Sequence, residues 1–216
     1  MITQRFDKFN ITDRGIKTAN FKTGSRMLDV GCGSGDTVNH LNEMGFKAEG
    51  IDINLVKISE AKAKYPGIDV KFGDGSFLDE YMSFTFDGVL IEDTLSHINQ
   101  PDEALHEAYC VMKKGGRIII RDIYEIDPDP NKIKATAIEA ARQARIPHKE
   151  GDCDEGTVER LVDFRLRGVF FKEPLVRQLE DEIGFKVISF EDFEGEERDD
   201  EGRRIGHFLL VAQKPI

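Results

Sequence analysis

The apolar positions of this chain form short runs separated by stretches with helical spacing. The runs predict β-strands near 26–30, 47–51, 68–72, 86–91 and 118–120. Between them, apolar residues three or four apart predict helices over about 35–45, over about 54–65 and from Pro101 onward, where proline fits the first helical turn. Strands that alternate with helices predict an α/β fold with a doubly wound, mostly parallel sheet.

The alternation stops near residue 125, where Pro128 and Pro130 mark a break. The alanine spacing beyond them predicts a helix over about 131–146, and a second helix is expected over about 155–168. We expect this insertion, 125–171, to form a helical lid over the substrate site. The earlier pattern resumes with a helix at 173–183 and strands near 185–191 and 205–213.

A chain of 216 residues is long enough for one α/β domain with an insertion. A weaker helical spacing over residues 11–22 precedes the first strand. We therefore interpret 1–216 as a single domain in which residues 1–22 form an N-terminal helical cover.

The segment from Met27 to Thr37 indicates where a ligand binds. An apolar strand around Asp29 ends in glycines at alternate positions, Gly31, Gly33 and Gly35, and a helix is predicted straight after them. Such a loop lets a ligand lie against bare backbone, and the helix N-terminus offers it unpaired N–H groups. Glycine suits the loop because φ can be positive there and because a Cβ would occupy the space of the ligand. This pattern predicts a nucleotide-type cofactor site.

The glycine spacing favours S-adenosylmethionine over a dinucleotide as the cofactor. A dinucleotide site has G-x-G-x-x-G, whereas this chain has G-x-G-x-G and places Asp36 where the third glycine would be. A carboxylate beside a pyrophosphate is repelled, and Asp29 adds a second acid. Two acids suit a positively charged ligand, and S-adenosylmethionine carries a sulfonium and an α-amino group but no phosphate.

The glycine loop resembles the first motif of class I S-adenosylmethionine-dependent methyltransferases, and further motifs follow in the order of that family. They are found at 47–54, 71–75, 86–93 and 112–120. The resemblance covers roughly 24–124, resumes near 172 and is nearest to the small-molecule ubiquinone/menaquinone-biosynthesis type. It implies a Rossmann-like, seven-stranded sheet in which the last two strands form a hairpin with an antiparallel closing strand.

The resemblance also implies which residues hold the cofactor. The set is Asp29, Gly31, Cys32, Gly33, Gly35, Asp52, Ile53, Asp74, Gly75 and Glu92. The loop backbone would face the methionine part, and Asp29 would act on its amino group. Asp52 would accept the ribose hydroxyls, with a strand-end capping acid as the alternative. Asp74 and the Gly75 amide would bind the adenine, on which Ile53 would pack; for Asp74 the alternative is a plain Asx turn. Cys32 is interpreted as a small loop residue rather than a reactive thiol.

Methyl transfer is an in-line displacement at carbon, so the protein mainly has to orient the acceptor and exclude water. A general base is needed only when the acceptor must lose a proton. Candidates stand where strands end: Glu92, Asp93 and His97 after the fourth strand, and Asp122 and Tyr124 after the fifth. Of these we favour His97, Asp93 and Tyr124. Histidine changes charge nearest neutral pH, but His97 could instead pack or flank the cofactor. Asp93 could instead cap a helix, and Asp122 and Tyr124 could be structural.

Arg14 and Gly15 lie where related enzymes carry a segment that covers the cofactor, the alternative being an exposed arginine before a helix. His148 and Cys153, within the insertion, are interpreted as surface residues.

The composition narrows the class of partner. A net charge of -11 without a Lys/Arg cluster argues against a nucleic-acid substrate. The cysteines, Cys32, Cys110 and Cys153, form no C-x-x-C pair, which gives no disulfide framework and fits a reducing cytoplasm. No signal-peptide pattern and no apolar run of the roughly 18 residues of a membrane span is visible. We expect a cytoplasmic enzyme that acts on a small-molecule acceptor, without a metal site.

Other functions remain open at this point. A protein that binds S-adenosylmethionine without turnover, as a sensor or partner subunit, would carry the same cofactor motifs. A nicotinamide oxidoreductase would need the G-x-G-x-x-G that this chain lacks. Methylation of protein or RNA is a fourth alternative, but Ile91 to Thr94 do not form the Asn-Pro-Pro-Tyr-type tetrapeptide of many amino-directed nucleic-acid enzymes. Arsenite methylation is disfavoured because Cys153 is the only cysteine in the insertion.

Overall fold

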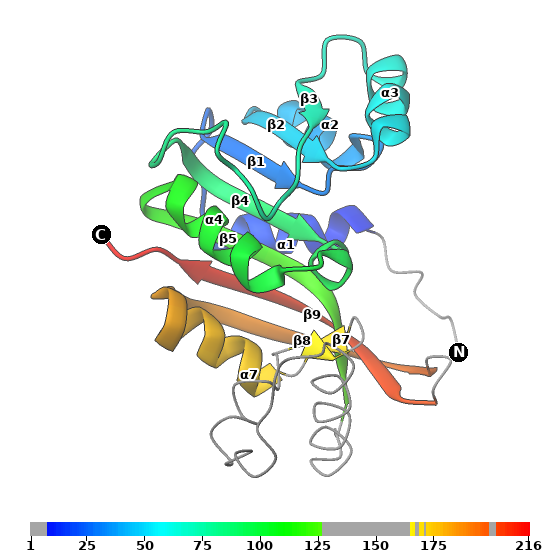
Figure 1. Cartoon of the computed structure of the whole chain (residues 1–216), viewed down its shortest axis with the longest axis vertical. Coiled ribbons are helices and arrows are strands. Elements are labelled where there is room, and N and C mark those ends of the chain that lie inside the picture. The colour runs from blue at the N-terminus through cyan, green and yellow to red at the C-terminus, as the bar shows by residue number, and fades with distance from the viewer. Residues whose placement is uncertain (1–7, 127–164, 167–168, 171, 199–201) are drawn as a thin grey trace, which may run out of the picture.

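The computed structural model describes residues 8–126, 165–166, 169–170, 172–198 and 202–216. A mixed β-sheet runs through this part of the chain, and helices cover both of its faces (Figure 1). The helix predicted over 131–146 and most of the helix predicted over 155–168 fall outside the described residues, as do His148 and Cys153. The lid expected over 125–171 therefore stays a prediction.

The sheet contains the strands that the apolar runs predict. In chain order they are β1 (Arg26–Val30), β2 (Lys47–Asp52), β3 (Val70–Phe72), β4 (Phe86–Glu92), β5 (Met112–Glu125), β8 (Lys186–Arg198) and β9 (Arg204–Gln213). β3, β2, β1, β4 and β5 lie side by side in that order and are parallel, whereas β9 runs antiparallel to both β5 and β8. The predicted seven-stranded, mostly parallel sheet with an antiparallel closing hairpin is confirmed.

Two short strands extend this pattern beside β5. β6 (Arg165–Leu166) and β7 (Val169–Phe170) pair antiparallel, and Phe170 aligns with Tyr124 of β5. The helix predicted over 155–168 is therefore wrong at its C-terminal end, where Arg165–Leu166 is extended. The reason is tertiary: the ring of Phe170 is fully buried and packs edge-on against Phe208 of β9, which fixes the segment to the sheet.

The helices agree with the apolar spacing. They are α1 (Lys8–Ala19), α2 (Asp36–Glu43), α3 (Leu55–Lys64), α4 (Pro101–Val111) and α7 (Lys172–Arg177), with a 3-10 turn, η1 (Leu95–His97), after β4. α7 continues as a π-helix, η2 (Gln178–Ile183), so the predicted helix at 173–183 is present but changes its hydrogen-bond pattern half way. Gly184, with a φ of 96°, ends it.

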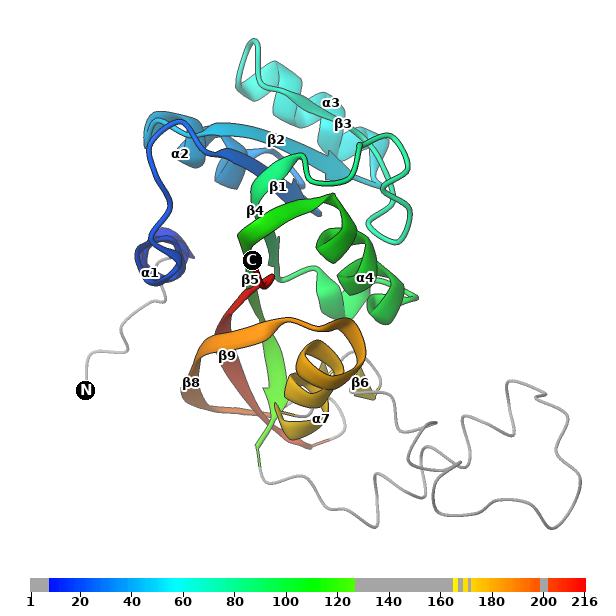
Figure 2. The ribbon, with the colours of Figure 1, turned by 90° about the vertical axis from the view of Figure 1, so that its left-hand side faces the viewer.

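The two faces of the sheet bury separate cores. Figure 2 shows the sheet close to edge-on, with α1 on one side and α4 and α7 on the other. Leu105 and Leu175 belong to the core beneath α4 and α7, whereas Ile16, Leu41 and Ile58 belong to the core beneath α1, α2 and α3. The parallel strands all end at one edge of this layered structure, which is where open α/β sheets bind their ligands.

Candidate functional site

The glycine loop between β1 and α2 has the left-handed conformation that its sequence predicts. The φ angle is 81° at Gly31, 52° at Gly33 and 78° at Gly35, values that residues with a side chain rarely adopt. The amides of Gly31 and Cys32 donate to the Ile51 carbonyl of β2 at 2.8 and 2.9 Å, which fixes the loop to the neighbouring strand. A Cβ on Gly33 would have no atom within 4 Å. At Gly33 the loop therefore offers a ligand an open backbone edge.

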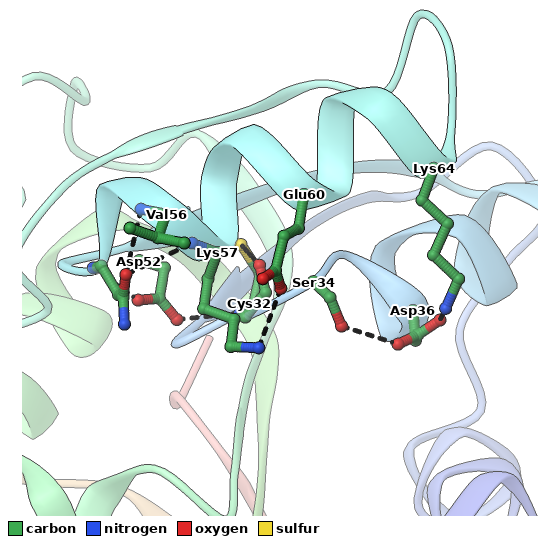
Figure 3. A network of polar contacts seen from close by, with 10 residues as sticks. Cys32, Ser34, Asp36, Asp52, Val56, Lys57, Glu60 and Lys64 are labelled. Atoms are coloured by element: carbon green, nitrogen blue, oxygen red, sulfur yellow. Dashed lines mark hydrogen bonds and ion pairs between the residues drawn. The ribbon is translucent and has the colours of Figure 1, made fainter.

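Asp52, at the end of β2, joins this loop to the start of α3. Its Oδ2 accepts from the Gly33 amide at 2.8 Å and its Oδ1 accepts from the Asn54 amide at 2.7 Å. The N-cap of α3 is Asn54, because its Oδ1 accepts from the amides of Val56 and Lys57 (Figure 3). A carboxylate has about four acceptor sites. Asp52 therefore keeps acceptor capacity for further donors, such as a pair of ribose hydroxyls.

Contrary to our inference from the sequence, Asp36 does not attract a positively charged ligand, because its carboxylate is already paired within the protein. Lys64 and the Tyr65 hydroxyl each donate to its Oδ1 at 2.5 Å, and the Ser34 hydroxyl donates to its Oδ2 at 2.9 Å. Figure 3 shows Ser34, Asp36 and Lys64 of this cluster at the C-terminal end of α3. Burial raises the pKa of Asp36, but the hydrogen bonds from Lys64, Tyr65 and Ser34 outweigh it and lower the pKa to about 2. Because the Asp36 carboxylate is paired with Lys64, Asp29 is the acid of these two that is left to attract a positively charged ligand.

Asp29 and Cys32 are both buried, with 2% and 6% exposed. The Cys32 side chain packs against the backbone of β2, since a Cβ on Gly50 would lie 2.7 Å from its Cβ and 2.9 Å from its Sγ. Burial, assisted by the carboxylates of Asp29 and Asp52, raises the pKa of the Cys32 thiol. A buried, protonated thiol is a poor nucleophile. The structure favours Cys32 as a packing residue whose backbone belongs to the loop.

The turn after β3 carries the residues expected to bind the adenine. Asp74 Oδ1 accepts from the Ser76 amide at 2.9 Å, so the Asx turn that we considered as the alternative is present. Gly75 is buried, and a Cβ on it would lie 2.6 Å from a β1 side chain. Ile53, next to Asp52, exposes 66% of its surface. An exposed isoleucine beside the loop gives an adenine ring a surface to cover, and the roles of Ile53, Asp74 and Gly75 stay predictions.

Beyond β4, side chains rather than backbone groups form the site. Glu92 is buried, and the Thr12 hydroxyl of α1 lies 2.9 Å from each of its carboxylate oxygens. The guanidinium of Arg121, on β5, lies 3.9 Å from the Glu92 carboxylate and 2.5 Å from that of Asp93. Asp93 has a φ of 50°, and its side chain is 57% exposed. A non-glycine residue with a positive φ is typical of functional sites, and here the ion pair with Arg121 holds an exposed carboxylate in place.

His97 lies on the same turn as Asp93. It is the last residue of η1, it is exposed, and its amide donates to the Thr94 carbonyl at 2.8 Å. The structure therefore brings two of the three catalytic candidates, Asp93 and His97, to one solvent-facing turn after β4.

Tyr124 and Asp122 lie in the packed interior instead. The Tyr124 ring is 7% exposed and meets Phe208 edge-on, and a Cβ on Gly206 would lie 2.6 Å from it. Asp122 is 1% exposed, and its Oδ2 accepts from the Ser96 amide at 2.9 Å, which attaches η1 to β5. Burial raises the pKa of Asp122. These contacts favour the structural alternative for both residues, and a catalytic role for Tyr124 stays a prediction.

Arg14 and Gly15 lie within α1 and contact the sheet rather than the glycine loop. Arg14 forms an ion pair with Glu191 of β8 and stacks over the Phe193 ring at 4.9 Å. A Cβ on Gly15 would lie 2.9 Å from Ile119 of β5, so this glycine allows α1 to pack closely. Neither contact supports the expectation that Arg14 closes over the cofactor.

Thr12 and Arg121 also belong to the side-chain cluster beyond β4, although no sequence motif identifies them. Thr12 is fully buried and lies three and four residues before Gly15 and Ile16 on the buried face of α1. This helical spacing could have identified Thr12 as a buried residue. Arg121 directly follows the buried run Ile118–Ile120 and is 5% exposed. A charged residue at the end of a buried strand indicates that Arg121 has a buried partner. The partners of Arg121 lie on or directly after β4, so the sequence alone does not identify them.

The described residues fit S-adenosylmethionine. The open backbone at Gly33, the remaining acceptor capacity of Asp52 and the exposed face of Ile53 lie along one path from the loop to the start of α3. Within the described ranges, no three His, Cys, Asp or Glu side chains are grouped to hold a metal ion. No helix in that part of the chain has the length and apolarity to cross a membrane.

Comparisons with known proteins agree with this geometry. A family profile described as "Methyltransferase domain" matches residues 21–163. The demethylmenaquinone methyltransferase of Renibacterium salmoninarum is 31% identical over 46% of this chain and 41% of its own length. An uncharacterized methyltransferase of Alkaliphilus oremlandii is 30% identical over 56% of each chain. The chain thus spans about half the length of these relatives. A putative methyltransferase from Bacillus halodurans has the same fold, with a TM-score of 0.68 and 18% identity over 94% of this chain and 98% of its own.

Proposed function

The chain belongs to the methyltransferase-domain family, and on that premise we propose that it transfers a methyl group from S-adenosylmethionine to a small-molecule acceptor. The observation that carries the proposal is the glycine loop. Three residues with positive φ hold it open at Gly33, and Asp52 fixes it to β2 and α3 through the Gly33 and Asn54 amides.

When bound, S-adenosylmethionine supplies an activated methyl group on a sulfonium leaving group. The chain supplies the surroundings of that group. Buried Asp29 lies beneath the loop to attract the amino group, and Asp52 accepts the ribose hydroxyls. The turn at Asp74 and Gly75 binds the adenine, and Ile53 covers its face. Gly31, Cys32, Gly33 and Gly35 line the loop, and Glu92 closes the site from β4.

Asp93 and His97 orient the acceptor. Arg121 holds the exposed Asp93 carboxylate in place after β4, where it can accept a hydrogen bond from an acceptor hydroxyl or amine. His97 is on the same exposed turn and can take a proton when the acceptor must lose one. The main contribution to rate is alignment of the acceptor with the methyl–sulfur bond.

The class of acceptor follows from charge and from the relatives. A net charge of -11 disfavours nucleic acid. Curated relatives are named as methyltransferases of demethylmenaquinone and of norajmaline, both small organic molecules. A cytoplasmic location is consistent with the cysteine content. The relatives' names favour an enzyme over a protein that only binds S-adenosylmethionine.

Release of S-adenosylhomocysteine tests the proposal. The purified chain is incubated with S-adenosylmethionine and a panel of small acceptors that present a hydroxyl, an amine or an activated carbon. We expect acceptor-dependent release that falls about tenfold or more in Asp93→Asn. Cofactor binding without acceptor-dependent release, across the panel and the small-molecule fraction of a cell extract, would instead support the binding-only alternative.

A further inference from the structure

Thr94, the residue between Asp93 and η1, contacts both halves of the site. Its hydroxyl donates to the Glu92 carbonyl at 2.9 Å and lies 3.4 Å from the Gly31 carbonyl. Its own carbonyl accepts from the His97 amide at 2.8 Å. One residue therefore lies against the first glycine of the cofactor loop and also holds the turn that carries the acceptor-side candidates.

The contact between Thr94 and Gly31 is close. A Cβ on Gly31 would lie 2.1 Å from Thr94 Cγ2, 2.3 Å from its Oγ1 and 2.7 Å from its Cβ. Both branches of the threonine thus occupy the space beside this glycine. A β-branched side chain has few χ1 states, and the hydrogen bond to the Glu92 carbonyl favours the state seen here.

This contact matters because a glycine backbone has more allowed conformations than that of any other residue. The φ of 81° at Gly31 is one of several conformations that glycine adopts with little cost. A rigid side chain packed against it limits the alternatives before a ligand arrives. A ligand that binds an ordered loop loses less free energy to ordering.

We propose that Thr94 is a positioning residue that fixes the cofactor loop through Gly31 and links cofactor occupancy to the turn carrying Asp93 and His97. The inference rests on the proposed function, because it requires the glycine loop to bind S-adenosylmethionine. If Thr94 only stabilised the fold, its truncation would lower stability without changing the affinity of the folded protein.

Calorimetric titration with S-adenosylmethionine separates these cases. The wild type is measured first, since its failure to bind would contradict the proposed function and the inference together. We expect Thr94→Ala to weaken the Kd by about tenfold, and Thr94→Ser, which keeps the hydroxyl but loses Cγ2 and the β-branch, to weaken it by an intermediate factor of about threefold. Thr85→Ala is the matched control, because the Thr85 hydroxyl also bonds a backbone carbonyl, that of Met82, away from the loop. Equal affinity of wild type and Thr94→Ala would overturn the inference while leaving the proposed function intact.

Amide hydrogen exchange tests the link to the acceptor side. S-adenosylhomocysteine is added at a saturating concentration to wild type and to Thr94→Ala. We expect it to slow exchange in residues 93–98 of the wild type, which contain the His97 amide, and to slow it less in the variant. Equal protection of this segment in both proteins would contradict the proposed link.

Discussion

The two halves of the site are built by different means. On the cofactor side, at the ends of β1 and β2, backbone groups dominate: glycines with positive φ and amides that donate to Asp52 or to the Ile51 carbonyl. On the acceptor side, at the ends of β4 and β5, buried side chains dominate. Thr12 reaches Glu92 across 80 positions of sequence, and Arg121 of β5 joins Glu92 to Asp93.

The difference has a functional consequence. The shape of the backbone loop depends on its glycines and on the Asp52 carboxylate. The buried side-chain cluster instead joins α1, β4 and β5, so it also holds the fold together. We therefore expect loss of the Thr12 or Arg121 side chain to lower stability more than cofactor affinity, and loss of the Asp52 carboxylate to lower cofactor affinity more than stability. Thr94, which lies against Gly31, is the exception on the acceptor side, because its truncation is expected to weaken cofactor binding.

The largest expected effect on stability is from Arg121→Met. The Arg121 side chain is 6% exposed and that of Glu92 is 2% exposed, so the variant leaves a buried carboxylate without its cation. We expect a loss of about 3 kcal/mol in the free energy of unfolding, measured in urea. S-adenosylmethionine affinity of the folded variant should stay near that of the wild type.

Arg26→Met is the control for this measurement. The pair of Arg26 and Glu49 is also an arginine–carboxylate contact, but the Arg26 side chain is 47% exposed. Exposed pairs contribute less than about 1 kcal/mol. If Arg121→Met lowers the free energy of unfolding by no more than Arg26→Met does, the buried cluster does not stabilise the fold more than an exposed ion pair.

Thr12→Val should have the next largest effect. Valine keeps the shape of threonine, but it removes the hydroxyl that lies 2.9 Å from both oxygens of Glu92. A hydrogen bond to a charged, buried group is worth about 2 kcal/mol. Thermal unfolding and faster amide exchange in α1 would report the loss, with Thr23→Val, at an exposed position, as the control. Unchanged exchange in α1 would show that this hydrogen bond does not hold the helix.

The smallest effect is expected from Asp36→Asn, on the cofactor side. The pKa of Asp36 is about 2 in the folded protein, below the ordinary value of 3.8, so ionised Asp36 stabilises the fold above about pH 4. That contribution is lost as the pH falls toward about 2. Because the cluster lies near the surface, we expect about 1 kcal/mol or less. Urea unfolding at a series of pH values should show the difference between wild type and variant shrinking below about pH 4; a difference independent of pH would contradict the pairing with Lys64.

The cofactor side could be predicted from the sequence because its signals are local. Alternate glycines after an apolar strand predicted the position of the loop. Positive φ was expected there and is found at Gly31, Gly33 and Gly35. The role of Asp36 was not predicted correctly, because Lys64 and Tyr65 are nearly thirty positions away and approach only when α3 packs beside the loop.

The acceptor side shows the limit of local patterns. Strand ends identified Asp93 and His97, but not the Thr12 hydroxyl that comes from α1 or the guanidinium that fixes Asp93. The same limit explains why the helix predicted over 155–168 is wrong at its C-terminal end. Arg165–Leu166 pairs with β7, which is held by a phenylalanine contact to β9 that no local spacing reveals.

Calorimetric titration with S-adenosylmethionine, set beside one with NAD, tests whether the glycine loop and Asp52 bind S-adenosylmethionine. We expect the wild type to bind S-adenosylmethionine in the micromolar range and not to bind NAD. Asp52→Asn should weaken binding by about tenfold or more, since it removes the charge and half of the acceptor capacity of the side chain that holds the Gly33 amide and that we propose binds the ribose. A folded wild type that binds NAD but not S-adenosylmethionine, or an Asp52→Asn variant that binds as tightly as wild type, would contradict the account.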